Sequence, residues 1–120
     1  MSEDLLLRRE FDRTGLPLLR ALVTESAIRA GLAGGAVGAF VHAALEIATN
    51  AVVHGGGHGT LEVRLTGGEL RCRVTDRGPG LTERATEGHG LRLAEALTGP
   101  LELHGGPGRL GTSATLAVRV

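Results

Sequence analysis

Two short groups of polar residues lie where the surrounding sequence is apolar. Glu46 and Asn50 are four positions apart within residues 39–54, a run that is otherwise almost wholly apolar. Asp76 ends an alternating apolar run and is followed by Arg77-Gly78-Pro79-Gly80. A carboxylate can accept a proton or a hydrogen bond, an amide oxygen suits a hard cation, and glycines let another group approach the backbone closely. Together these two groups indicate a nucleotide site.

The first group lies on one side of a predicted helix. Four residues turn an α-helix only about 40° beyond a full circle, so the polar residues of the run share one stripe: His42, Glu46, Asn50 and His54. Glu46 is the only formal charge in the run, and apolar side chains occupy the other directions. We therefore expect a largely buried helix whose polar stripe faces a cavity or a partner group. The alternative is a polar network bonded to neighbouring loops, since buried polar groups are usually satisfied whatever their function.

Asp76 would stand at the end of a strand, where the following glycines leave space. An ionised carboxylate facing an adenine amino group would accept a charge-assisted hydrogen bond worth about 1.5–3 kcal/mol in a desolvated pocket. The alternative is an ordinary turn, in which Asp followed by glycine is common.

Gly88-His89-Gly90 would open a helix with free backbone amides, which can bind phosphate oxygens. It does not match a Rossmann fingerprint, and a Walker-type loop is excluded because all thirteen basic residues are Arg.

The elements that would position these residues alternate between strands and helices. Residues 5–11 read as a short strand or an extended arm. Residues 60–66, 69–75, 101–104 and 112–120 read as strands, with Gly67-Gly68 as a hairpin turn. Helices are expected from Pro17 to about Ala30, from about Ala36 to His54, and from Gly88-His89-Gly90 to Gly99-Pro100. This order predicts an α+β fold with a mixed or antiparallel sheet and helices on one face.

Composition excludes several classes of partner. The 120 residues suffice for one domain, formal charge is zero, and the aromatic residues are two Phe alone, so neither a nucleic-acid nor a membrane surface is indicated. We expect no secretory signal and a cytoplasmic protein, because the N-terminus is acidic and has only three leucines before Arg8. Cys72 reads as a small buried hydrophobe. A zinc site at His54, His58, Cys72 and His89 is disfavoured, because these residues fall on separate elements.

The series Glu-x-x-x-Asn, Asp-x-Gly-x-Gly, Gly-x-Gly and Gly111-Thr112 resembles the GHKL (histidine kinase-like) ATPase superfamily. Within it, Asn50-Ala51-Val52-Val53-His54-Gly55 and the small size look most like the anti-sigma-factor serine/threonine protein kinases. The resemblance implies that residues 1–120 form a single histidine kinase-like ATPase domain. It also implies a Bergerat-type two-layer sandwich with about three helices on one face of the sheet.

The resemblance further implies a role for each matched residue. Glu46 matches the general base, Asn50 the Mg²⁺ ligand and Asp76 the carboxylate that recognises adenine. The remaining matches surround the nucleotide: Gly78 and Gly80 give the base room, Thr112 supports the base contact, Gly88, Gly90 and Leu91 lie beside the phosphates, and His54 ends the helix. The implied cofactors are ATP and Mg²⁺.

The expected function is that of an Mg²⁺-ATP-binding regulatory domain, which binds a sigma factor or similar regulator and phosphorylates an antagonist protein. Only seven residues, Leu81 to Glu87, separate Gly80 from Gly88, whereas these relatives usually carry a longer lid. A short lid would leave the γ-phosphate wet, so nucleotide binding is better supported than transfer. The alternatives are a non-catalytic nucleotide-sensing interaction module and a purely structural domain. An apolar first strand and the glycine-rich residues 30–38 could support a homodimer.

Overall fold

The computed structural model describes residues 3–76, 78, 89–104 and 111–120. In chain order the elements are β1 (Glu3–Asp12), the short 3-10 helix η1 (Arg13–Gly15), α1 (Leu16–Arg29), α2 (Gly35–His54), β2 (His58–Thr66), β3 (Glu69–Asp76), α4 (His89–Thr98), β4 (Glu102–His104) and β5 (Thr112–Arg119). Each predicted strand and helix is present, with ends that differ from the prediction by a few residues.

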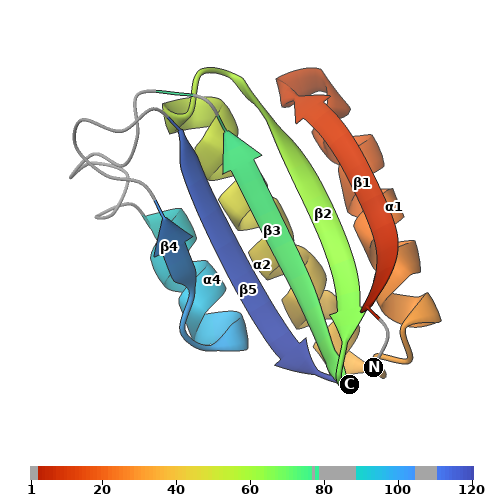
Figure 1. Ribbon diagram of the computed structural model, residues 1–120. Coiled ribbons are helices and arrows are strands. Elements are labelled where there is room, and N and C mark those ends of the chain that lie inside the picture. The colour runs from red at the N-terminus through yellow and green to blue at the C-terminus, as the bar shows by residue number, and fades with distance from the viewer. Residues whose placement is uncertain (1–2, 77, 79–88, 105–110) are drawn as a thin grey trace.

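The strands form one sheet in the order β1-β2-β3-β5-β4, and every neighbouring pair is antiparallel. Helices α1, α2 and α4 cover the same face of this sheet (Figure 1). The predicted two-layer α+β architecture is therefore confirmed, and the sheet is antiparallel rather than mixed.

The hairpin between β2 and β3 sets the register of the central strands. Gly67 and Gly68 have φ of 56° and 81°, a left-handed pair that matches the twist of a two-residue hairpin. Thr66 then pairs with Glu69 and Thr60 with Thr75. In this register Leu61 and Val74 point toward the helices, and both are buried.

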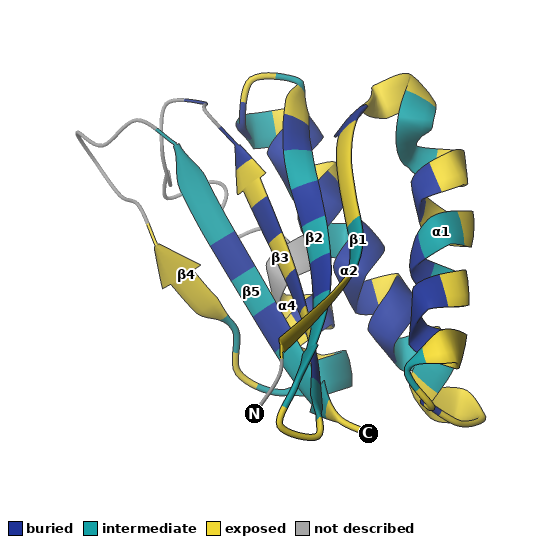
Figure 2. Cartoon of the chain, turned by 45° about the vertical axis from the view of Figure 1, so that its right-hand side comes forward, coloured by how far each residue is buried: buried dark blue, intermediate teal, exposed yellow. Residues whose placement is uncertain are grey.

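The core lies between the sheet and α2. Alternate residues of β3 are buried through Asp76, while the residues between them are exposed on the opposite face (Figure 2). From α2, Phe40 is fully buried and Ile47 is 2% exposed. The helix is long and apolar enough to meet a length-and-hydropathy criterion for a membrane span. Its burial among the sheet and the other helices accounts for that composition equally well.

Helix α1 lies beside β1 and α2 (Figure 1). It begins next to Pro17, whose fixed φ suits a first helical turn. Leu19, Val23, Ser26 and Ala27 face the core, so the opposite side of α1 forms part of the molecular surface.

Candidate functional site

The polar stripe of α2 reaches the surface while the rest of the helix is buried. Glu46 is 30% exposed, and its Oε1 lies 3.3 Å from Nε2 of His42, one turn earlier. Asn50 and His54 are half-buried further along the helix. Among the described residues, no hydrogen bond engages the side-chain amide of Asn50. The stripe therefore presents a carboxylate, held by a histidine, followed by an amide.

Asp76 continues the buried side of β3 rather than turning into solvent. It is 8% exposed and follows Leu70, Cys72 and Val74 on the face that packs toward the helices. Its Oδ1 accepts a hydrogen bond of 2.9 Å from the backbone N–H of Gly78. This bond orients the carboxylate at the end of the strand.

The end of α2 packs directly against this carboxylate. A Cβ added to Gly55 would lie 2.4 Å from Cγ and 2.5 Å from Oδ2 of Asp76. Gly78 is equally close, because a Cβ there would meet the carbonyl carbon of Gly55 at 2.5 Å. No side chain fits at either position. Gly55, which follows His54 at the end of α2, is therefore in contact with Asp76 and Gly78 at the end of β3. The two polar groups seen in the sequence are joined by this contact.

Thr112, the first residue of β5, lies next to Asp76 in the sheet. It is the register partner of Asp76, and the preceding Gly111 donates its N–H to the carbonyl of Gly78 at 2.8 Å. The structure thus brings Thr112 beside Asp76, as the predicted base contact requires.

The electrostatics of Asp76 reflect opposing effects. Burial raises the pKa of its carboxyl above the ordinary value, whereas the backbone N–H groups of Gly78 and Thr112 and the charge of His58 lower it. His58 is exposed at the start of β2. Sequence reasoning missed the proximity of His58, because nothing in the local sequence reports the strand register that creates it.

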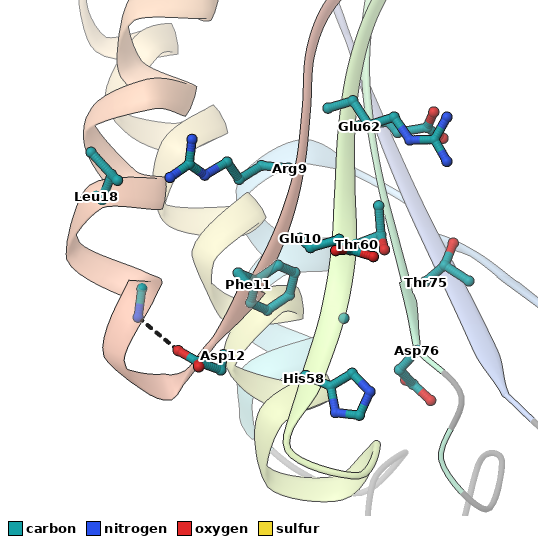
Figure 3. A pocket seen from close by; sticks show the side chains of 13 residues that line it. Arg9, Glu10, Phe11, Asp12, Leu18, His58, Thr60, Glu62, Thr75 and Asp76 are labelled. Carbon is teal, nitrogen blue, oxygen red and sulfur yellow. Dashed lines mark hydrogen bonds between the residues drawn. The ribbon is translucent and has the colours of Figure 1, made fainter.

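A groove of about 640 Å³ opens next to Asp76 and crosses the ends of β1, β2 and β3. Figure 3 shows Asp12, His58 and Asp76 at one end of it, with Phe11, Thr60 and Thr75 nearby. Neither Glu46 nor Asn50 lines this groove. It is therefore a separate surface that shares Asp76 with the predicted site.

Several predicted site residues lie outside the part of the chain that the structure describes. Gly80, Gly88 and the short predicted lid of residues 81–87 belong to this group. Gly90 and Leu91 lie in the first turn of α4, as predicted for a helix that begins at the second glycine pair.

The donor set on α2 suits Mg²⁺ better than zinc. Mg²⁺ is usually bound through one or two protein oxygens together with water and phosphate, which one amide and a nearby carboxylate can supply. Within the described ranges, no three His, Cys, Asp or Glu residues are grouped as a protein-only metal site would require. The side chains of α2 therefore fit Mg²⁺, with the amide oxygen of Asn50 as the candidate ligand.

The histidine kinase-like ATPase domain family matches residues 10–117. No curated protein sequence matches the chain. A crystal structure of the RsbU and RsbW domains of Rv1364c from Mycobacterium tuberculosis matches at a TM-score of 0.74 with 29% identity, covering 99% of this chain and 32% of that one. The chain thus spans about a third of that protein's length.

A second solved structure, the Acinetobacter baumannii histidine kinase AdeS, matches at a TM-score of 0.59 with 12% identity. The match covers 95% of this chain and 68% of that one. At this identity it supports the fold alone.

Proposed function

Because the chain belongs to the histidine kinase-like ATPase family, we propose that it binds Mg²⁺-ATP and phosphorylates a serine or threonine of a protein antagonist. The observation that carries this proposal is the close approach of Gly55 to the buried carboxylate of Asp76. It joins the end of the helix that carries Glu46 and Asn50 to the carboxylate that would recognise the base.

Asp76 would read the adenine amino group. Its Oδ1 already accepts from Gly78, and a carboxylate has further lone pairs for a second donor. The absence of side chains at Gly55 and Gly78 lets the backbone at both positions pack closely against the carboxylate and each other, which holds the carboxylate in place. Gly80 would leave room for the base, and Thr112 would support the base contact from the neighbouring strand.

Phosphoryl transfer would depend on the stripe of α2. Asn50 would hold Mg²⁺, which when bound offsets the charge of the phosphates. Glu46 would accept the proton of the attacking hydroxyl as its oxygen bonds to the γ-phosphorus and the bond to the bridging oxygen breaks, releasing ADP. His42, 3.3 Å away, would orient the Glu46 carboxylate. His54, Gly88, Gly90 and Leu91 would surround the phosphates.

Thermal unfolding with and without Mg²⁺-ATP tests the nucleotide site. Ligand at about one hundred times its dissociation constant should stabilise the wild type by roughly 2.7 kcal/mol. Asp76→Asn should lose most of this gain, because an amide that turns its N–H₂ toward the base cannot accept from the adenine amino group. Asp4→Asn, the same change at an exposed position of β1, is the matched control. A wild type that ATP does not stabilise would favour a purely structural domain.

The second candidate function is a nucleotide-sensing interaction module without catalysis. The short stretch of seven residues between Gly80 and Gly88 favours it, because so few residues would make a short lid for excluding water from the γ-phosphate. Glu46→Gln separates the two functions, since it preserves shape while removing the proton acceptor. If the wild type transfers phosphate to a co-encoded antagonist and Glu46→Gln only binds ATP, the kinase proposal holds. If both bind and neither transfers or hydrolyses, the sensor proposal replaces it.

We further propose that residues 1–120 act as one domain in the cytoplasm. Its protein partners would be a sigma factor or similar regulator and the antagonist that is phosphorylated. The likeness to the RsbW domain of the solved structure supports protein partners of this kind.

A further inference from the structure

His58 lies at the end of the groove that reaches Asp76, and the register of the first two strands places it there. It is the register partner of Asp12, and all three residues line the groove. In Figure 3 the imidazole of His58 lies between the carboxylates of Asp12 and Asp76. A single exposed side chain at the start of β2 is thus flanked by two carboxylates.

The two carboxylates differ in how firmly they hold their charge. Oδ1 of Asp12 accepts from the hydroxyl of Thr14 at 2.7 Å and from the backbone N–H of Gly15 at 3.1 Å. The bond from Thr14, followed by those from the backbone, holds the pKa of Asp12 below its usual range. Asp76 is 8% exposed, and burial raises its pKa. Of the two, Asp76 takes up a proton more readily, and a positive charge on His58 opposes that uptake.

The other charged side chains of the groove lie further along the strands. Arg8 and Glu62, which are register partners of opposite charge, line it four positions away from Asp12 and His58. Helix α1 contributes the uncharged Leu18, and His54 at the end of α2 does not line the groove. The remaining charged residues of the lining are Arg9 and Glu10. Within the described part of the groove, His58 is therefore the cationic group placed to act on Asp76.

The charge state of a carboxyl decides which purine it can recognise. An ionised carboxylate only accepts hydrogen bonds, whereas a protonated one also has a hydroxyl that donates. Adenine presents a donating amino group where guanine presents an accepting carbonyl oxygen. A site built around one hydrogen bond rejects a ligand that leaves its polar group unpaired. An ionised Asp76 would therefore select adenine, and a protonated Asp76 would admit guanine.

We propose that His58 is a specificity-determining residue, whose positive charge keeps Asp76 in its accepting form and so makes the site select ATP over GTP. This role rests on the proposed function, because it requires Asp76 to read the base. His58 acts through Asp76 and is in that sense a positioning residue. Histidine side chains gain their charge as pH falls through about 8 to 5, the same direction in which a carboxyl takes up its proton. Selection should therefore persist to a lower pH than the burial of Asp76 alone would allow.

The test is the ratio of the GTP and ATP dissociation constants, measured with Mg²⁺ by titration calorimetry from about pH 8 to 5. In His58→Gln the preference for ATP should be about two- to fivefold smaller than in the wild type at the acidic end, the range expected for a solvent-screened charge pair. His58→Arg, which keeps a positive charge, should retain the wild-type preference. Attraction of a cation to the phosphates would change both constants alike, so the ratio reports the base alone.

Two controls show whether His58 acts through Asp76. His104→Gln, the same change at an exposed position of β4, should leave the ratio at its wild-type value. In an Asp76→Asn background, His58→Gln should leave the ratio unaltered at every pH, because no carboxyl remains to take up a proton.

The outcomes separate this role from the proposed function. A wild type that binds ATP, with the same ratio in His58→Gln at every pH, overturns the role of His58 alone. An Arg variant that behaves like the Gln variant does so too, because the charge would then be irrelevant. A wild type that binds neither nucleotide overturns the proposed function itself.

Discussion

The contact between Gly55 and Asp76 leads to opposite predictions for two glycines: Gly38 inside α2 and Gly55, the residue that caps the end of this helix. Replacing Gly55 by Ala should destabilise the protein, because the new methyl group would meet Oδ2 of Asp76 at 2.5 Å and the carbonyl of Ala51 at 2.6 Å. Replacing Gly38 by Ala should stabilise it, because a Cβ there meets nothing within 4 Å. Neither residue has positive φ, so backbone strain does not enter the comparison.

The magnitudes follow from the two environments. Overpacking of a tight site costs about 1–3 kcal/mol, and the loss of glycine flexibility in the unfolded chain offsets about 0.4–1 kcal/mol of this. A net loss of about 1–2 kcal/mol is expected for Gly55→Ala. For Gly38→Ala, an unhindered helical position, a gain of about 0.5–1 kcal/mol is expected. In a chain of this size, 1 kcal/mol corresponds to about 4 °C in Tm.

Denaturant unfolding with an unchanged m-value, together with thermal unfolding, measures both variants. Gly55→Ala should melt about 4–8 °C below the wild type, and Gly38→Ala about 2–4 °C above it. Gly55→Ala should also weaken ATP binding, since the methyl group displaces the Asp76 carboxylate, whereas Gly38→Ala should not. If both variants gain stability, α2 and the end of β3 do not touch as described, and the argument for the joined site fails.

Two further predictions concern buried ionisable groups. Burial raises the pKa of Asp76 in the folded protein above its value in the unfolded chain, so folding takes up protons. The contribution of Asp76 to the free energy of unfolding should therefore fall as pH rises from the ordinary Asp range through the raised pKa. Asp76→Asn should flatten the dependence of unfolding free energy on pH in this range. Denaturant unfolding of the wild type and Asp76→Asn over a series of pH values, without nucleotide, measures this, and parallel curves for the two proteins would show that Asp76 does not cause the dependence. Burial also raises the pKa of Cys72, so a thiol reagent should label it only at the rate of unfolding, and prompt labelling of the native protein would show that the thiol is accessible.

The strands and helices were predictable because their signals are local. In β3, Leu70, Cys72 and Val74 alternate with polar residues, and a strand with one buried face produces that alternation directly. Gly67-Gly68 marked the hairpin because few other residues adopt its left-handed turn. The buried character of α2 followed from an apolar run with only one charge. The proposed roles of Glu46, Asn50 and Asp76 came from a resemblance to a family and remain predictions.

Other features depend on how distant segments meet. The sequence allowed a mixed or an antiparallel sheet, and only the pairings of β1 with β2 and of β3 with β5 decided between them. The influence of His58 on Asp76 arises from the register of β2 against β3. The same register forms the groove that Asp76 shares with β1 and β2. Register is set by the packing of the whole sheet on its helices, so no single segment reports it.

By itself the sequence determined which residues are apolar at helical or strand spacing, where the chain turns, and which side chains can accept a proton or bind a cation. These properties depend on residues within a few positions of one another in the chain, whose relative directions are fixed by the geometry of a helix, strand or turn. Only the tertiary structure decided that Gly55 touches the carboxylate of Asp76 and that Thr112 pairs with it. The reason is that contacts between residues far apart in the chain form only when the entire core packs, and their energies depend on the geometry of that packing.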